Sequence, residues 1–267
     1  MSPVQSAQPV TKHRDGRIGR QESARAPALS VIIPAINEEK LLPGILEQFT
    51  PELRMKHDLE LIVSDGGSTD RTLEIARAVA DVVVENTSGQ KQTISIGRNM
   101  GARHARGKVL VFLNADTRVK DPDRFLTEVA IQVRPPEVAA VTCRVGVYPS
   151  EERRIDRAYH GFYNWFFSMM NRVGMAMGRG ECHVMRREVF ETVKGYAGDI
   201  VAGEDYDMFR RLHALGRVRF LHDLQVYESP RRFRRYGYLR VTASWFLNFL
   251  SVFLLRRSIL RDWTPIR

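Results

Sequence analysis

Cysteine is scarce in this sequence of 267 residues. Only Cys143 and Cys182 are present, far apart and outside any metal-ligand spacing. Two isolated thiols exclude a disulfide framework and favour a reducing compartment. A chain of this length buries about three quarters of its extended surface and folds without covalent links. We therefore expect two buried free thiols.

Long hydrophobic runs are also missing. The longest uncharged stretch near the end, Val241 to Leu255, is shorter than the ~20 residues that a membrane-spanning helix needs. No apolar run follows the basic residues near the beginning, so we expect no signal peptide. Residues 1–28 are rich in Pro, Gln, Ser and Arg, lack apolar periodicity, and are predicted to form a disordered arm. These features predict a cytoplasmic protein.

Acidic residues are outnumbered by basic ones. The chain has 41 Lys and Arg against 31 Asp and Glu, a formal net charge of +10. Such a surplus predicts an anionic partner, and nucleic acid, acidic lipid headgroups and a phosphorylated substrate all satisfy it. A nucleic-acid-binding protein is therefore one hypothesis for the function.

Short apolar runs alternate with segments of helical periodicity. The runs in the first half are apolar on both faces, which is typical of parallel strands covered by helices and predicts an α/β fold. Aspartate followed by proline, at Asp121 and Pro122, predicts a capped helix start. The predicted strands are 29–34, 59–63, 82–84, 109–113 and 182–186, with two more short strands before residue 228; the predicted helices are 41–49, 73–79, 90–106, 151–177 and 204–215.

Polar side chains follow three of the predicted strands. Asn37 and Glu38 come after the first, Asp65 after the second, and Asn114 and Asp116 after the fourth. Ligands bind outside the carboxyl ends of the strands in open sheets of this type, so these residues mark a candidate site. The segment from Asp65 to Asp70 adds two glycines that allow close approach of backbone to a ligand, although a plain turn uses the same residues.

Two acidic motifs predict specific chemistry. Asp116 is placed to hold Mg²⁺ or Mn²⁺ on a diphosphate, because hard cations prefer oxygen ligands; the alternative is a simple turn. The segment Gly203-Glu-Asp-Tyr-Asp207 places three carboxylates at a helix start. One of them is a candidate general base for an acceptor hydroxyl, and helix capping is the alternative.

Five motifs in order resemble family 2 glycosyltransferases of the GT-A fold. The resemblance runs from about Leu29 to Pro230 and implies inverting transfer from a nucleotide diphosphate sugar, UDP- or GDP-linked, with Mg²⁺ or Mn²⁺ as cofactor. The motifs are Val31 to Glu38, Ser64-Asp-Gly-Gly-Ser-Thr-Asp70, Gly97-Arg-Asn-Met-Gly-Ala-Arg103, Phe112-Leu-Asn-Ala-Asp116 and Gly203-Glu-Asp-Tyr-Asp207.

The resemblance also implies roles for individual residues. Asp205 matches the catalytic base, Asp116 the metal ligand, and Glu204 and Gly180 the acceptor side. Asn114 stands where the family has the first acid of an Asp-x-Asp signature, so we expect weakened metal binding. The late histidine of many members has no clear counterpart here. The residues implied to line the nucleotide pocket are Pro34, Asn37, Glu38, Asp65, Arg98, Asn99 and Asn114.

The last segment is basic and then amphipathic. Arg232 and Arg235 resemble an arginine element of the family that holds the donor diphosphate or a phospholipid, and a solvated basic linker is the alternative. Residues 241–255 have polar Ser244, Asn248 and Ser251 on one helical stripe, with arginines on both sides. This pattern fits a helix in a membrane interface, and packing on its own domain or in a homodimer also accounts for it.

The resulting prediction is a peripheral enzyme on the inner face of a membrane. It comprises an arm (1–28), a GT-A domain (29–228, with a nucleotide-sugar half 29–120 and an acceptor half 121–228) and a basic amphipathic helical tail (229–267). Its expected partners are the donor, a hydroxyl acceptor that is lipid-linked, and an anionic membrane surface, without nucleic acid. A sugar nucleotidyltransferase is the third hypothesis, but the glycine-rich basic loop that this class has after its first strand is missing.

Overall fold

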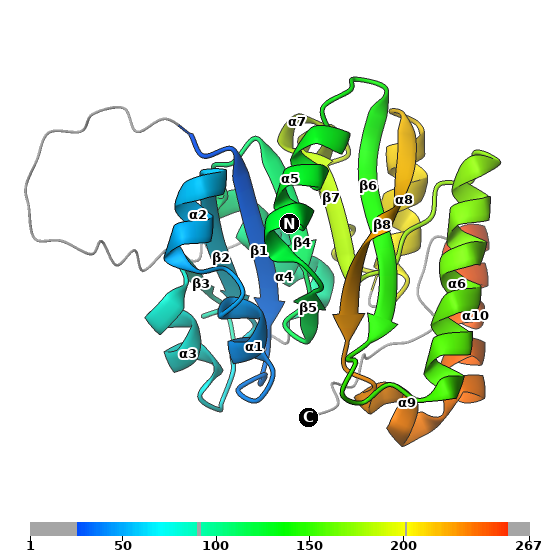
Figure 1. Ribbon diagram of the computed structural model, residues 1–267, viewed down its shortest axis with the longest axis horizontal. Helices are drawn as coiled ribbons and strands as arrows, with labels where there is room; N and C mark the ends of the chain where they lie inside the picture. The colour runs from blue at the N-terminus through cyan, green and yellow to red at the C-terminus, as the bar shows by residue number, and fades with distance from the viewer. Residues whose placement is uncertain (1–25, 90–91, 201, 256–267) are drawn as a thin grey trace, which may run out of the picture.

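The computed structural model describes residues 26–89, 92–200 and 202–255. One eight-stranded sheet runs through the molecule with helices against both of its faces (Figure 1). The predicted α/β class and the GT-A arrangement are confirmed. The strands are β1 (Leu29–Ala35), β2 (Leu59–Asp65), β3 (Val82–Glu85), β4 (Val109–Leu113), β5 (Thr117–Val119), β6 (Val138–Val147), β7 (Cys182–Arg186) and β8 (Arg217–Glu228).

Ten helices are described. Most of the predicted arm (residues 1–25) and the end of the predicted tail (residues 256–267) lie outside the described residues. The helices are α1 (Leu42–Leu46), α2 (Pro51–His57), α3 (Thr72–Val79), α4 (Ile94–His104), α5 (Pro122–Gln132), α6 (Arg154–Arg172), α7 (Arg187–Thr192), α8 (Glu204–His213), α9 (Arg231–Tyr236) and α10 (Tyr238–Leu255).

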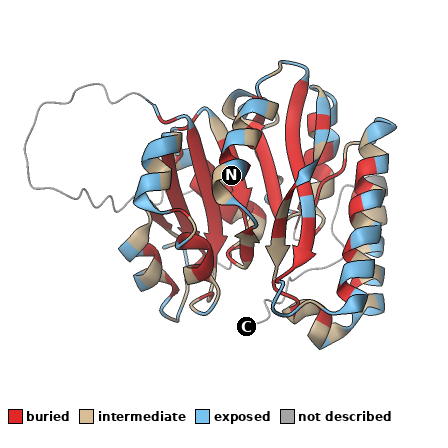
Figure 2. Ribbon diagram, viewed as in Figure 1, coloured by how far each residue is buried: buried red, intermediate tan, exposed pale blue. Residues whose placement is uncertain are grey.

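The first half of the sheet is parallel. The strand order is β3-β2-β1-β4-β7-β6-β8-β5, and the β1–β2, β1–β4 and β2–β3 pairs are all parallel. Every residue of β1 and β2 is buried, as expected for strands covered on both faces (Figure 2). The carboxyl ends of β1, β2 and β4 therefore meet at one edge, where the polar residues follow.

The second half of the sheet is mixed. β7 is antiparallel to β4 and β6, whereas β8 is parallel to β6. The expectation of two short strands before residue 228 is wrong, because β8 is one strand of 12 residues. Its register against β6 shifts between Cys143 and Arg144, and such an irregularity breaks the alternation of side chains that marks a single strand in a sequence.

Local capping signals set the helix ends. The side chain of Asp121 accepts a hydrogen bond from the Arg124 amide at 3.1 Å, so the predicted start of α5 is confirmed. The helix expected over 90–106 begins at Ile94, because Thr93 caps it and accepts from the Ile96 amide at 3.2 Å. Both thiols are free and buried, as expected.

Helices α6 and α10 lie side by side. The Tyr159 hydroxyl is 2.9 Å from that of Thr242, and the rings of Tyr163 and Trp245 are 6.4 Å apart. The other side of α6 covers β6, where the Asn164 amide group pairs with the backbone of one β6 residue. Within the described part of the chain, no helix has both the length and the apolar character needed to cross a membrane.

Candidate active site

A cavity of about 420 Å³ opens at the carboxyl ends of β1 and β4. The starts of α8 and α9 and one side of α10 complete its wall. Its size is ordinary for a small-ligand site. Nine of the residues predicted from the sequence line it: Pro34, Glu38, Arg98, Asn114, Asp116, Gly180, Glu204, Asp205 and Arg232.

Two predicted pocket residues, Asn37 and Asp65, build turns beside the cavity and do not line it. The Asp65 carboxylate accepts from the amides of Gly67 and Ser68, each at 2.9 Å. Gly67 has a φ of +89°, which suits glycine. Asn37 accepts from the Thr69 amide at 2.7 Å, so the turns after β1 and β2 are linked.

The remaining two predicted residues also lie outside the cavity lining. Both polar atoms of the Asn99 amide bond to the backbone of Tyr196, at 2.8 and 2.9 Å, and hold that turn against α4. Arg235 is exposed, with its guanidinium 5.6 Å from the ring centre of Tyr236. Both residues matched a sequence motif, but their positions in the fold give them these other contacts.

Arg98 ties three segments of the cavity wall together. Its side chain is fully buried, and it donates to Glu204 at 3.0 Å, to the Asn114 side chain at 3.0 Å and to the Gly180 carbonyl. The guanidinium also lies over the ring of Tyr196, 5.1 Å from its centre. These bonds satisfy both terminal nitrogens of the guanidinium, whereas its buried Nε has no hydrogen-bond partner. The charge of Arg98 also neutralises the carboxylate of Glu204.

Arg231 joins two carboxylates at the cavity rim. It donates to both oxygens of Glu38, at 2.9 and 2.6 Å, and to Asp116 at 3.1 Å. We did not select Arg231 from the sequence, because its partners lie 193 and 115 residues away. The run of basic residues after β8 was the only signal in the sequence for it.

Asp116 has the chemistry of a cation ligand. Its side chain is 22% exposed at the rim. Burial raises its pKa, the charge of Arg231 opposes this, and Glu181 adds to it. No group of three or more acidic, histidine or cysteine residues in the described part of the chain is arranged to hold a metal ion alone. Burial and the second acid destabilise the ionised form of this carboxylate. A divalent cation whose remaining ligands come from a bound diphosphate would stabilise that form.

A second acidic cluster lies deeper in the wall and was missed. Arg179 donates to Glu181, to Glu228 and to the ring of His160. Burial, then the nearby Glu181, raises the pKa of Glu228 well above its usual value. Burial and the charge of Arg179 lower the pKa of His160 to about 3. A neutral imidazole is thus held beside the cluster; the isolated positions of these residues in the sequence did not mark them.

Asp205 stands at the start of α8, after Gly203 in a left-handed conformation. The dipole of a helix favours the ionised form of a carboxylate at its N-terminus. The reverse holds: burial, then the charge of Glu204, raises the pKa of Asp205 to about 8, although the Tyr206 amide donates to it at 2.9 Å. Desolvation outweighs the dipole here. Asp207 accepts from Arg210 at 3.1 Å and from Arg211 at 2.7 Å, so its charge is already paired.

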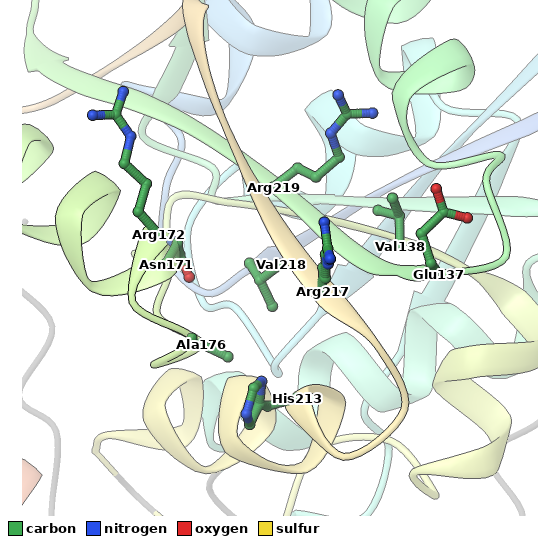
Figure 3. A pocket seen from close by; sticks show the side chains of 10 residues that line it. Glu137, Val138, Asn171, Arg172, Ala176, His213, Arg217, Val218 and Arg219 are labelled. Carbon is green, nitrogen blue, oxygen red and sulfur yellow. The ribbon is translucent and has the colours of Figure 1, made fainter.

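A hollow of about 540 Å³ lies at the opposite end of β8 (Figure 3). Arg172 of α6, His213 of α8 and the β8 residues Arg217 and Arg219 contribute to its lining, with Glu137 as its acid. The hollow is basic and contains no pair of carboxylates. Several carboxylates instead line the cavity at the β1 and β4 ends.

The chain is similar in sequence to known glycosyltransferases. The family model described as "Glycosyl transferase family 2" matches residues 30–194. The O-antigen biosynthesis protein RfbC of Myxococcus xanthus is 27% identical over 208 residues, which is 71% of this chain and 16% of that protein. The dolichyl-phosphate beta-glucosyltransferase of Mus musculus is 31% identical over 147 residues, 49% of this chain and 44% of that protein. The chain thus spans less than half the length of either relative.

Solved structures share the fold. A mannosyltransferase of Pyrobaculum calidifontis in complex with GDP-Man and Mn²⁺ gives a TM-score of 0.62 at 23% identity, covering 81% of this chain and 61% of that one. A glucosyl-3-phosphoglycerate synthase of Mycobacterium tuberculosis, in complex with Mn²⁺, UDP and glucosyl-3-phosphoglycerate, gives 0.58 at 21% identity, covering 92% and 86%.

Proposed function

The chain belongs to glycosyl transferase family 2, and from that premise we propose that it moves a sugar from a nucleotide diphosphate sugar to a hydroxyl acceptor with inversion. One observation carries the proposal. The cavity holds a rim carboxylate suited to a cation, Asp116, and a half-buried carboxylate with a pKa raised to about 8, Asp205. A single displacement needs both a stabilised leaving diphosphate and a base for the acceptor hydroxyl.

The donor binds on the β1 and β4 side of the cavity in this proposal. Pro34 and Asn114 line that side, and the turns built by Asn37 and Asp65 lie beside it. Arg232 lines the cavity and offers a cation to the diphosphate. The related folds bound to GDP-Man or UDP support a UDP- or GDP-linked donor.

Asp116 would hold Mg²⁺ or Mn²⁺. When bound, the ion would neutralise the developing charge of the diphosphate leaving group. Arg231, which bonds to Asp116, would lie beside the same phosphates and share this charge. Mn²⁺ in the two related folds supports this role.

Asp205 accepts the proton of the acceptor hydroxyl in this proposal. Its raised pKa makes it a better base than an ordinary aspartate, provided that it is ionised when the acceptor attacks. Arg98 pairs with Glu204, so that neighbouring carboxylate is already engaged by a cation. A Cβ added at Gly180 would lie 3.9 Å from the Asp205 carboxylate, so the glycine keeps the space beside the base open for the acceptor.

Two features favour sugar transfer over the other hypotheses. A sugar nucleotidyltransferase needs a basic glycine-rich loop after its first strand, whereas β1 is followed by Ile36, Asn37 and the acidic Glu38. The carboxylates that line this cavity would repel the phosphates of a nucleic acid.

The acceptor is proposed to be lipid-linked, and the enzyme to act as a peripheral protein on the inner face of a membrane. The name of the mouse relative contains a lipid phosphate, and the name of the Myxococcus relative an O-antigen, which supports this class of acceptor. The apolar outer faces of α6 and α10 support the location on a membrane surface.

A panel of UDP- and GDP-sugars tests the proposal. Purified protein is incubated with Mn²⁺, each donor and polyprenyl phosphate, and release of nucleoside diphosphate and the anomeric configuration of the product are measured. A nucleoside diphosphate at 100 times its Kd should stabilise the protein by about 2.7 kcal/mol. Absence of turnover and of any nucleotide-induced shift in Tm across the panel would refute the proposal; a product with retained configuration would refute inversion.

A further inference from the structure

Helix α6 has an exposed apolar stripe along its outer side. Phe162 and Trp165 are each 56% exposed. The members of the stripe are three or four residues apart, so they share one face of the helix. They are Ile155, Ala158, Phe162, Trp165, Met169 and Val173, the last immediately after the helix end.

Helix α10 turns its polar stripe inward. Asn248 and Ser251 are buried, whereas Phe246 and Leu247 are more than half exposed. A helix that packs on its own domain in water has the opposite arrangement. The exposed apolar positions of α10 are Leu239, Ala243, Phe246 and Leu247.

The two stripes lie on the same side of the helix pair. Contacts advance together along both helices, from Tyr159 with Thr242 to Tyr163 with Trp245, so the helices are parallel. At 100° a residue, each stripe lies roughly a quarter to a third of a turn from the contact line, in opposite rotational senses on the two helices. Because the two helices are parallel, stripes that are rotated in opposite senses from the contact line face the same side of the pair. We call this combined surface the α6/α10 face.

The exposed charges on these two helices are all positive in the described residues. They are Arg154, Arg157 and Arg172 on α6 and Arg240 on α10. The one acid, Asp156, is buried and paired with Arg234.

A hollow of about 270 Å³ beside the α6 stripe is basic as well. Arg144, Arg172 and His222 contribute to its lining, next to Trp165 and Met169. Arg172 also lines the hollow that Figure 3 shows. An aromatic apolar stripe with cationic edges fits lipid chains flanked by anionic headgroups.

We propose that the α6/α10 face rests on the surface of a bilayer that contains anionic lipids. The inner sides of the same two helices supply Phe167, Trp245 and Asn248 to the wall of the cavity. The cavity is therefore about one helix diameter, roughly 10 Å, from the lipid surface. A lipid-linked acceptor reaches Asp205 from that side; this last step rests on the proposed sugar transfer, whereas the docking does not.

Charge favours the bilayer over a second copy of the chain. Two α6/α10 faces packed on each other would bring arginines against arginines, because neither helix offers an exposed acid. Like charges at an interface oppose association. An anionic bilayer supplies the complementary charge.

Vesicle flotation with the full chain tests the docking. Wild type should bind phosphatidylglycerol-containing vesicles at low salt and bind pure phosphatidylcholine at least about tenfold more weakly. F162E/W165E should lower binding by about tenfold or more. The matched control is M55E/I131E, which changes exposed apolar residues on α2 and α5 and should bind as wild type does. R154E/R172E should also weaken binding, whereas R103E/R124E, on α4 and α5, should do so far less.

Brominated lipids give a second readout that does not depend on a charged substitution. They should quench the fluorescence of the vesicle-bound protein, and Trp165→Phe should remove much of that quenching. Wild type that ignores anionic vesicles, or F162E/W165E that binds them normally, would overturn the docking. A dimer that F162E/W165E dissociates would assign the face to a second copy.

The proposed membrane docking and the proposed sugar transfer can be refuted independently of each other. Nucleotide-induced stabilisation is measured without vesicles, and F162E/W165E should retain it with an unchanged Tm. Vesicle binding by a chain that turns over no donor would refute the transfer and leave the docking in place. Turnover by a chain that binds no vesicle would refute the docking and leave the transfer in place.

Discussion

The buried guanidinium of Arg98 lies 3.0 Å from the carboxylate of Glu204, 106 residues further along the chain. This pair joins α4, which lies between the parallel strands β3 and β4 in the chain, to the start of α8. It also separates the roles of two adjacent acids, because Glu204 is paired with a cation and Asp205 is not among the partners of Arg98. The choice of Asp205 as the base depends on this separation.

Arg98→Met should destabilise the protein strongly. The change leaves Glu204 buried without its cation, which costs about 3–5 kcal/mol, and thermal unfolding should show a Tm roughly 10 °C lower. Arg71→Met is the matched control, because Arg71 pairs with Glu74 on the exposed surface. Equal Tm values for the two variants would mean that the Arg98 pair does not stabilise the cavity.

Asp205→Asn should lower kcat about 10²–10⁴-fold while the donor still binds, because the amide keeps the shape and removes the base. Asp207→Asn is the comparison, since Asp207 is occupied by Arg210 and Arg211. It should change kcat only a few fold. Near-normal kcat in Asp205→Asn, together with an inactive Asp207→Asn or Glu204→Gln, would assign the base to another carboxylate.

The rate of sugar transfer should increase as pH rises through about 8. Burial and Glu204 raise the pKa of Asp205 to about 8, so the basic form is a minority at pH 7 and becomes the majority above pH 8. A profile of kcat/KM against pH should therefore rise with an apparent pKa near 8 and then level off. A profile that is flat between pH 6 and 9 would contradict this assignment.

The stability of the folded protein should decrease as pH rises, whereas the rate increases. The carboxyl of Asp205 has a folded pKa of about 8 and an ordinary value of 3.8, so the unfolded chain releases its proton first as pH rises. Its stabilising contribution is complete below about pH 4 and is lost as pH rises through 8. Asp205→Asn cannot ionise, so its Tm should fall less than that of wild type between pH 6 and 9. Parallel Tm curves for the two proteins would refute the raised pKa.

Asp116→Ala should abolish transfer, because the leaving diphosphate loses its cation. EDTA should do the same to wild type, and Mn²⁺ in excess should restore the rate. Asp121→Ala removes the cap of α5 and leaves the cavity unchanged, so it should keep its activity at temperatures below its Tm. Full donor turnover in excess EDTA would rule out the metal.

Local patterns made much of the fold predictable. β4 and β7 have the predicted bounds: β4 is an apolar run between Lys108 and Asn114, and β7 ends at the charged Arg186. The short helices α2, α7 and α9 and the strands β5 and β6 were not predicted; one or two helical turns show too little periodicity. β8 was divided because a register shift disturbs its alternation. Apart from β6, these errors concern length and regularity, which a window of sequence samples poorly.

The sequence by itself determined the order of strands and helices, the polar residues at the strand ends and the family to which the chain belongs. Only the tertiary structure decided which of those residues face one cavity. Arg231 reaches Glu38 and Asp116 across most of the chain, and α10 turns Asn248 inward and Phe246 outward. Burial by segments distant in sequence raises the pKa of Asp205 above what its helix position suggests. Periodicity and motifs are local properties, whereas desolvation and ion pairing depend on neighbours that only folding brings together.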